Sequence, residues 1–102
     1  MRYHWCHGRE DGFEAARQVR YAVFVQEQGY SLENEFDDTD AESIHLIGFE
    51  EGTPLCTARA YHQNGVWHIG RVAVSKKARG RGIGAQMMEK IVEKLKELGA
   101  VT

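Results

Sequence analysis

The sequence predicts one α+β domain, an antiparallel sheet with helices before and after it in the order β-α-(α)-β-β-β-α. Three observations lead to this prediction. Short strand-like segments separated by turn residues fill the middle of the chain. A helix-compatible stretch without glycine or proline precedes them, and a longer amphipathic stretch follows them. The 102 residues fit one domain rather than two, so residues 1–102 are assigned to a single domain.

The first third of the chain predicts one strand and one helix. Residues 2–6 are short and aromatic, which is a weak strand signal. The helix begins at Asp11 or Gly12 and covers residues 13–28, and Gly29 ends it. Its apolar residues form one stripe of Phe13, Ala16, Val19, Val23 and Phe24.

The middle of the chain predicts an antiparallel meander. Its strands are residues 43–49, 55–61 and 66–74. Glu51-Gly52 marks the first turn between them. The second turn is Asn64-Gly65, the strongest short hairpin signal that a sequence offers.

A second, strongly amphipathic helix is predicted after the meander. Residues 76–82 form a basic, glycine-containing loop before it, and Gly99 ends it. Its apolar residues recur at helical spacing, and we expect Met87 and Met88 to fill gaps in the core or at its margin. The set is Ile83, Met87, Met88, Ile91, Val92, Leu95 and Leu98.

Composition excludes several classes of function. The net charge of −2 disfavours bulk binding to nucleic acid or to anionic membranes. Two cysteines do not make a disulfide scaffold, and no apolar run approaches the length of a membrane span. His4, Cys6 and His7 lie close together, but strand alternation separates His7 from the others, so we expect no metal. With no signal peptide pattern, we expect a cytoplasmic protein.

The segment from Val72 to Gly84 carries the chemistry. It runs from a strand through a basic loop and glycines into a helix, whose first backbone N–H groups have no intrahelical partner. The helix dipole attracts anions there, and glycines leave a phosphate room to approach. Arg79 and Arg81 can add charge-assisted hydrogen bonds. The alternative is a basic surface loop that leads into a helix. We expect Lys76 and Lys77 to be solvated charges rather than specific ligands.

Two common phosphate motifs do not fit this segment. A Walker loop requires Gly-Lys-Ser/Thr, whereas Gly84 is followed by Ala85 and Gln86. Gly80, Gly82 and Ala85 match a relaxed dinucleotide fingerprint. That fingerprint places its glycines directly after the strand, and here a basic insert separates them from it.

Arg79-x-x-Gly82-x-Gly84 resembles the Q/R-x-x-G-x-G/A signature of the GNAT N-acetyltransferase superfamily. The strand Gly-Arg-Val-Ala-Val before it and the amphipathic helix after it occupy the positions that they have in that family. Further segments resemble a bacterial ElaA-like branch, namely residues 20–28, 37–40 and 44–46.

The resemblance implies acetyl-coenzyme A as co-substrate and an amine as acceptor. The backbone of Arg79, Gly80, Arg81, Gly82, Ile83 and Gly84 would bind the pyrophosphate. The backbone of Val72, Ala73 and Val74 would pair with the pantetheine arm. The amine would attack the thioester directly, and a backbone N–H, that of Val72, would stabilise the oxyanion.

The attacking amine must be neutral, so a base or a water chain is useful. The sequence predicts that the acidic stretch from Glu33 to Glu42 is a solvated loop. In the family that it resembles, however, this region faces the acceptor, where it would suit a cationic amine. The candidate bases are Glu33, Glu35, Asp37, Asp38, Glu27 and His68, and the sequence selects none of them.

The family continues past the second helix with further strands and a helix, which these 102 residues lack. Three explanations stay open: a fragment, a natural truncation, and completion by a second copy. We expect truncation with self-association as a homodimer. A non-catalytic domain that binds coenzyme A or self-associates is the alternative function. A small nucleic-acid-binding module is a third, and the net charge of −2 counts against it.

Overall fold

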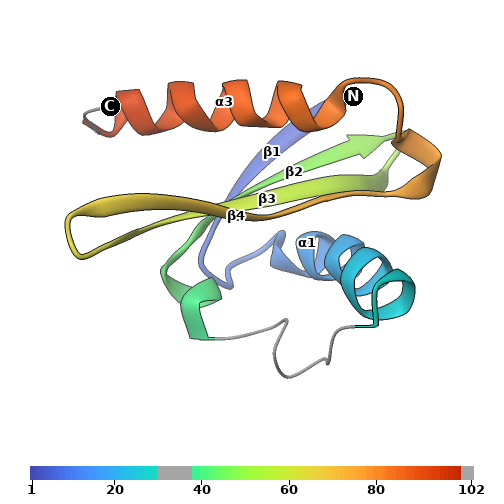
Figure 1. The fold of residues 1–102 in the computed structure, drawn as a ribbon, viewed down its shortest axis with the longest axis horizontal. Helices are drawn as coiled ribbons and strands as arrows, with labels where there is room; N and C mark the ends of the chain where they lie inside the picture. Colours follow the sequence, from blue (N-terminus) through green and yellow to red (C-terminus); the bar gives the residue numbers. More distant parts are fainter. Residues whose placement is uncertain (30–37, 100–102) are drawn as a thin grey trace.

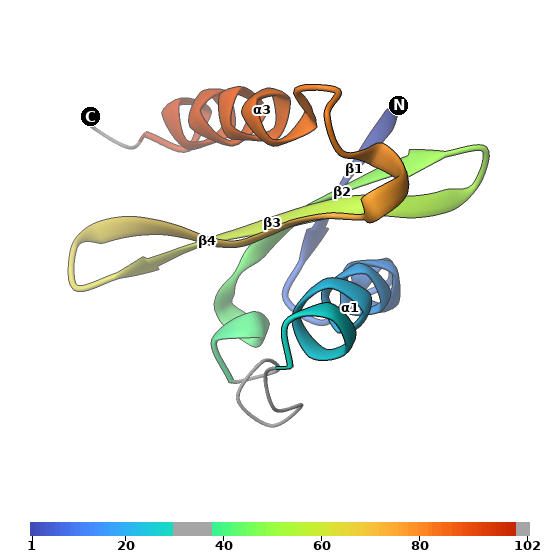
Figure 2. The same ribbon diagram turned by 45° about the vertical axis from the view of Figure 1, so that its right-hand side comes forward.

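The computed structural model describes residues 1–29 and 38–99. Its centre is an antiparallel four-stranded sheet in the order β1-β2-β3-β4, with α1 on one face and α3 on the other (Figures 1 and 2). The α+β class and the predicted order of elements are confirmed. The elements are β1 (Arg2–His7), α1 (Phe13–Arg20), the π-helix η1 (Tyr21–Glu27), the 3-10 helix η2 (Asp38–Glu42), β2 (Ile44–Glu50), β3 (Thr53–Gln63), β4 (Val66–Val74), the 3-10 helix η3 (Lys76–Ala78) and α3 (Ile83–Glu97).

Tight turns join the three central strands as predicted. Asn64 and Gly65 have φ values of 54° and 78°, and Glu51 and Gly52 have values of 52° and 80°. Positive φ at both central residues is what a type I′ turn requires. Because such turns continue the ladder to their ends, β3 begins at Thr53 and is longer than predicted. Pro54 is tolerated near its start, where the register with β2 shifts.

The first helix differs from the prediction. It is α-helical only to Arg20 and continues as a π-helix from Tyr21 to Glu27. The predicted stop is present, since Gly29 has a φ of 78° and donates its N–H to the carbonyl of Val25 over 3.1 Å. The π-helical turn is wider than an α-turn, so the side chains after Arg20 point in directions that an α-helical pattern does not predict.

The sheet separates two apolar layers. On the α3 side, Leu46, Ala58 and Ala60 pack against the helix. On the other side, Ala16 packs with Cys6 and Ile47, and Val19 and Val23 pack on Ala73 of β4. The end of α1 and the start of η1 therefore lie against β4, the strand that leads into the basic loop.

The α3 helix buries a narrower stripe than its sequence predicts. Its buried residues are Ile83, Met87, Ile91 and Leu95, spaced four apart. Met87 is buried, whereas Met88 is exposed, as are Val92 and Leu98 of the same apolar set. Each exposed residue lies one or more positions away from the buried row, and one position rotates a side chain by about 100° around the helix.

Candidate functional site

The chain leaves β4 through a short 3-10 turn that uses up the first backbone donors of the loop. The N–H of Ser75 donates to Leu55 over 2.7 Å, and that of Ala78 donates to Ser75 over 2.9 Å. The N–H of Arg79 makes a longer bond of 3.4 Å to Lys76. The donors that remain for a ligand therefore begin at Gly80.

The backbone N–H groups from Gly80 to Ala85 have no hydrogen-bond partner within the described residues. The next amide, that of Gln86, donates to the carbonyl of Gly82 over 3.2 Å and starts the α3 ladder. A run of unsatisfied N–H groups at the start of a 15-residue helix is a site for an anion. The run contains residues 80–84 of the predicted set 79–84 and adds Ala85, whereas the N–H of Arg79 is bonded within the loop.

The loop glycines give these donors both shape and room. Gly80 and Gly82 have φ values of 80° and 71°, in the left-handed region that other residues rarely adopt. A Cβ placed on Gly80, Gly82 or Gly84 meets no protein atom within 4 Å. Gly84 is helical without a positive φ, and glycine in a helix is less stable than alanine. Packing within the described chain therefore does not require glycine at position 84, whereas close approach of a ligand would.

The side chain of Arg79 turns back from the loop toward β4 and η1. Its Nε donates to the carbonyl of Val74 over 2.9 Å. Its terminal nitrogen donates to both carboxylate oxygens of Glu27, over 2.8 and 2.7 Å. Glu27, a predicted candidate base, thus has both oxygens bound to the signature arginine.

Arg81 turns the other way and pairs with Glu50 at the end of β2. Both side chains are exposed. The Arg81 hydrogen bond lowers the pKa of Glu50, and the same bond raises the pKa of Arg81. Both loop arginines are therefore paired with carboxylates, whereas the backbone N–H groups from Gly80 to Ala85 have no partner within the described residues.

The edge of β4 supplies a second row of backbone groups beside the loop. Ala73 pairs with Thr57 of β3, and Ser75 donates to Leu55. Because N–H groups alternate along an antiparallel strand, those of Val72 and Val74 point away from β3. β4 is the last strand of the described sheet, so these groups face an open edge.

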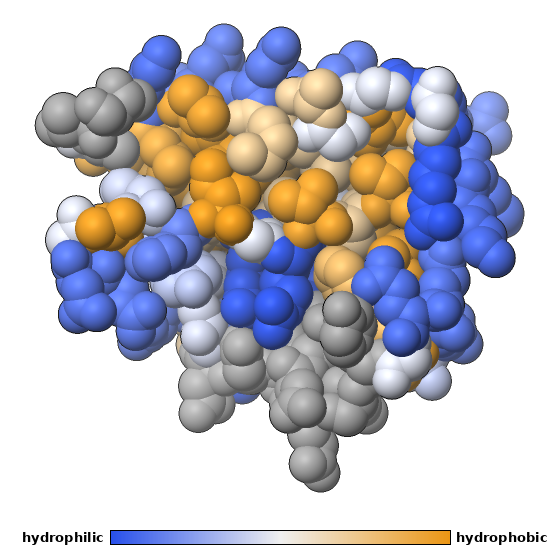
Figure 3. Space-filling view, viewed as in Figure 1, coloured by the Kyte–Doolittle hydropathy of each residue, from blue (hydrophilic) through white to orange (hydrophobic). Residues whose placement is uncertain are grey.

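A β-bulge lies where this row begins. The register between β3 and β4 shifts between Thr57 and Arg59, and Arg71 has a φ of 51°. Bulges occur at sheet edges and next to sites because they redirect the strand. Figure 3 shows apolar side chains gathered along α3 and the strand below it, and Val72, Met88 and Val92 are among the exposed apolar residues.

The remaining candidate bases are placed only in part. His68 lies on β4 and stacks on Tyr61, with ring centroids 5.1 Å apart. It precedes Val72 by four residues, which is about 13 Å along an extended strand. Glu33, Glu35 and Asp37 lie outside the described residues. Asp38 begins η2.

A buried charge cluster behind η1 is absent from the sequence-based interpretation. Oδ1 of Asp40 accepts from Arg20 over 2.7 Å and from Arg59 over 2.9 Å, and all three side chains are buried. Asp40 belongs to the stretch that we predicted as a solvated loop, and for this residue that prediction is wrong. An arginine inside the apolar stripe of a helix was the available signal, because a buried cation requires a partner.

His45 completes this cluster. Its Nε2 lies 3.1 Å from the carbonyl oxygen of Asp40, to which the ring donates when Nε2 carries the proton. Burial lowers the pKa of His45, although the neighbouring Asp40 opposes the shift. His45 therefore favours the neutral form in the folded chain.

The part of the chain that the structure describes gives little indication of a metal site or of a membrane-spanning helix. No group of three or more His, Cys, Asp or Glu residues is arranged to hold a metal there. Cys6 is buried, and His4 packs edge-on against Phe49. No described helix is long and apolar enough to cross a membrane.

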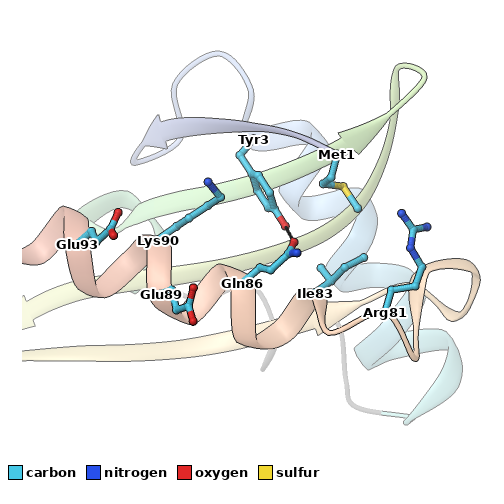
Figure 4. A pocket seen from close by; sticks show the side chains of 8 residues that line it. All are labelled: Met1, Tyr3, Arg81, Ile83, Gln86, Glu89, Lys90 and Glu93. Atoms are coloured by element: carbon cyan, nitrogen blue, oxygen red, sulfur yellow. Dashed lines mark hydrogen bonds between the residues drawn. The ribbon is translucent and has the colours of Figure 1, made fainter.

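An open cavity of about 550 Å³ lies on the other flank of α3, facing β1 (Figure 4). The Tyr3 hydroxyl donates to Gln86 over 3.1 Å there, and Lys90 lies over the Tyr3 ring. Burial raises the pKa of Tyr3, which favours its protonated form. This cavity does not include the open edge of β4.

Comparison with known proteins identifies relatives of the whole described fold. The model of the Acetyltransferase (GNAT) family matches residues 9–102. Escherichia coli ElaA is 34% identical over 83 residues, covering 78% of this chain and 54% of ElaA. An acyl-CoA N-acyltransferase from Pseudomonas aeruginosa superimposes with a TM-score of 0.85 at 30% identity, covering 95% of this chain and 71% of that one.

A GNAT family acetyltransferase from Brucella melitensis, solved in complex with acetyl-CoA, shares the fold with a TM-score of 0.70 at 22% identity. The match covers 97% of this chain and 71% of that structure. The chain spans between 54% and 65% of the length of four curated relatives that it matches.

Proposed function

Because this chain belongs to the GNAT acetyltransferase family, on its ElaA-like branch, we propose that it binds acetyl-coenzyme A and transfers the acetyl group to an amine. The observation that carries the proposal is the run of unsatisfied backbone N–H groups from Gly80 to Ala85. They lie where the family signature predicts the pyrophosphate, and the glycines among them leave it room.

Two sets of backbone groups hold the co-substrate in this proposal. The amides from Gly80 to Ala85 bind the pyrophosphate with support from the α3 dipole. The edge groups of Val72 and Val74 hydrogen-bond the amides of the pantetheine arm, as a neighbouring strand would. This order directs the thioester along β4 toward the bulge at Arg71.

The acetyl transfer is a direct attack. The neutral amine forms a bond to the thioester carbonyl carbon, the carbon–sulfur bond breaks, and the thiolate leaves and takes up a proton. The N–H of Val72 stabilises the negative charge on the carbonyl oxygen, and a donor of this kind lowers the barrier by roughly 2.7–4 kcal/mol in comparable acyl transfers.

The acceptor amine needs a proton acceptor, and we propose Glu33 and Glu35 for this role ahead of His68. Both belong to the acidic stretch that attracts a cationic amine. His68 is the weaker candidate because it lies about 13 Å from Val72 along β4 and stacks on Tyr61.

A second candidate function is a non-catalytic domain that self-associates as a homodimer through β4. The observation that favours it is the open edge of this strand, where Val66 and Val72 are exposed. If the chain forms a dimer and coenzyme A dissociates it, the ligand and the second copy compete for this edge. Sedimentation velocity measures the dissociation. In either case the free thiols of Cys6 and Cys56 fit a cytoplasmic location.

The test is calorimetric titration of coenzyme A into the chain and into two glycine variants. Gly82→Val and Gly84→Val each place a branched side chain among the amide donors, and we expect a loss of affinity of at least about 100-fold. Gly84→Val introduces no left-handed strain, so it separates blockage from misfolding. Equal affinity of both variants and the wild type would contradict the site.

Turnover then separates the two functions. Release of free thiol from acetyl-coenzyme A in the presence of a panel of amines supports the transferase. Coenzyme A binding without turnover of any amine supports the non-catalytic domain instead.

A further inference from the structure

We propose that Glu27 is a positioning residue for the acyl-donor site and acts through Arg79. In this inference, the Glu27 carboxylate holds the arginine that opens the amide-bearing loop, and it joins η1 to that loop as one unit. The inference rests on the proposed function, since the loop is taken to bind coenzyme A.

The side chain of Arg79 contacts two segments that are distant from each other in sequence, β4 and η1. One side of its guanidinium donates to the Val74 carbonyl on β4, over 2.9 Å. The other donates to both oxygens of Glu27, the last residue of η1, over 2.8 and 2.7 Å. The guanidinium therefore spans from the strand edge to the helix and cannot rotate without breaking several charge-assisted bonds.

The position of Arg79 makes this contact consequential for the loop. It is the residue immediately before Gly80, the first of the unsatisfied amides. Gly80 and Gly82 sample a wide range of backbone conformations, so a loop that contains both loses much entropy when its amides converge on one ligand. Anchoring its first residue by the side chain reduces that loss before the ligand arrives.

The anchor is also partly shielded from water. The Glu27 side chain is only 19% exposed, although that of Arg79 is 45% exposed. Partial burial of Glu27 and the further bond from Arg79 Nε to the Val74 carbonyl distinguish this pair from an ordinary surface ion pair, which contributes little. η1 in turn packs on the strand through Val23 and Ala73, so Glu27 is carried by a segment that is itself fixed to β4.

The same loop contains a matched control. Arg81 pairs with Glu50, and both of these side chains are well exposed, at 45% and 38%. Within the described residues, the hydrogen bonds of the Arg81 side chain go to the Glu50 carboxylate and not to a backbone carbonyl, unlike the Arg79 bond to Val74. Glu27→Gln and Glu50→Gln therefore each remove one negative charge opposite a loop arginine, but only the first removes an anchor.

The experiment measures coenzyme A affinity by calorimetry for the wild type, Glu27→Gln and Glu50→Gln, with thermal unfolding of each as a check on folding. We expect about a tenfold loss for Glu27→Gln and less than about a twofold change for Glu50→Gln. In an Arg79→Met background, we expect Glu27→Gln to cause no further loss, because its effect passes through Arg79.

A spectroscopic readout separates positioning from a general loss of stability. The Nε–H resonance of Arg79 should exchange slowly with water in the wild type and in Glu50→Gln, and faster in Glu27→Gln. Equal affinity of Glu27→Gln and the wild type would overturn the inference, as would a further loss in the Arg79→Met background. If the wild type itself does not bind coenzyme A, the proposed function fails instead.

Discussion

Two arginine-containing regions of the molecule use their polar groups differently. Behind η1, Arg20 and Arg59 are buried and both donate to Asp40. In the loop before α3, Arg79 and Arg81 are half-exposed and pair with separate carboxylates, while the backbone N–H groups beside them have no partner in the described chain.

The difference shows which donors serve the fold and which are available to a ligand. Buried charges must be paired inside the protein because their desolvation is otherwise too costly. Exposed backbone donors can stay unsatisfied by protein groups because water hydrates them until a ligand replaces it. Positive side chains occur in both regions, so they do not distinguish an anion site from a buried charge cluster. The unsatisfied backbone N–H groups do, because they identify the loop as the candidate anion site.

The largest expected effect comes from breaking the buried region. Asp40→Ala leaves two buried cations without their shared carboxylate, and we expect the free energy of unfolding to fall by about 3–5 kcal/mol. Urea denaturation measures it, and Glu42→Ala, an exposed neighbour, should change it by less than about 0.5 kcal/mol. Similar stability of the two variants would show that the cluster does not hold the fold.

The next effect is a pH dependence that belongs to the same cluster. Burial places the pKa of His45 below that of an unfolded histidine, about 6.5. Its contribution to stability is therefore complete above about pH 6.5 and is lost as the pH falls toward the folded pKa, because the unfolded chain takes up a proton first. Urea denaturation between about pH 7.5 and 5 should show a smaller decline for His45→Gln than for the wild type. Parallel declines would contradict this.

A smaller effect in the opposite direction is expected at Gly84. Gly84→Ala removes a helical glycine at a position with open space around it, so we expect stabilisation by about 0.4–1 kcal/mol. Coenzyme A affinity should stay within about threefold of the wild type, since a methyl group is small. A gain in stability together with complete loss of binding would mean that the ligand packs more closely than we propose.

The smallest effect is expected at the exposed pair. Arg81 lowers the pKa of Glu50, so the pair forms above the Glu50 pKa and its stabilisation is lost as the pH falls through it. Because both groups are exposed, we expect no measurable change in unfolding midpoint for Glu50→Gln at neutral pH. A clear drop in the midpoint would mean that the pair contributes to the fold as the buried cluster does.

Local signals made much of this molecule predictable. Asn64-Gly65 fixes a two-residue turn by backbone sterics, so β4 has the predicted bounds of Val66–Val74. The loop glycines and the helix after them predicted an anion site because both requirements, left-handed backbone and free N–H groups, lie within one short segment.

The features that could not be predicted depend mainly on contacts between residues that are far apart in sequence. Asp40 reads as solvated within an acidic stretch, and only the fold brings Arg20 and Arg59 to it. The pairing of Arg79 with Glu27 is non-local in the same way. The bulge at Arg71 is an exception, because Gly70 beside it is a local signal: a glycine inside a strand often marks a bulge.

The central claim is that the amides from Gly80 to Ala85 bind the diphosphate of coenzyme A. The most direct measurement is a titration of the ¹⁵N-labelled chain with coenzyme A, followed through its backbone amide resonances. We predict the largest shifts from Gly80 to Ala85, smaller ones at Val72 and Val74, and none at Asp40 and Arg59. Shifts centred instead on Tyr3 and Lys90, on the other flank of α3, would contradict the account.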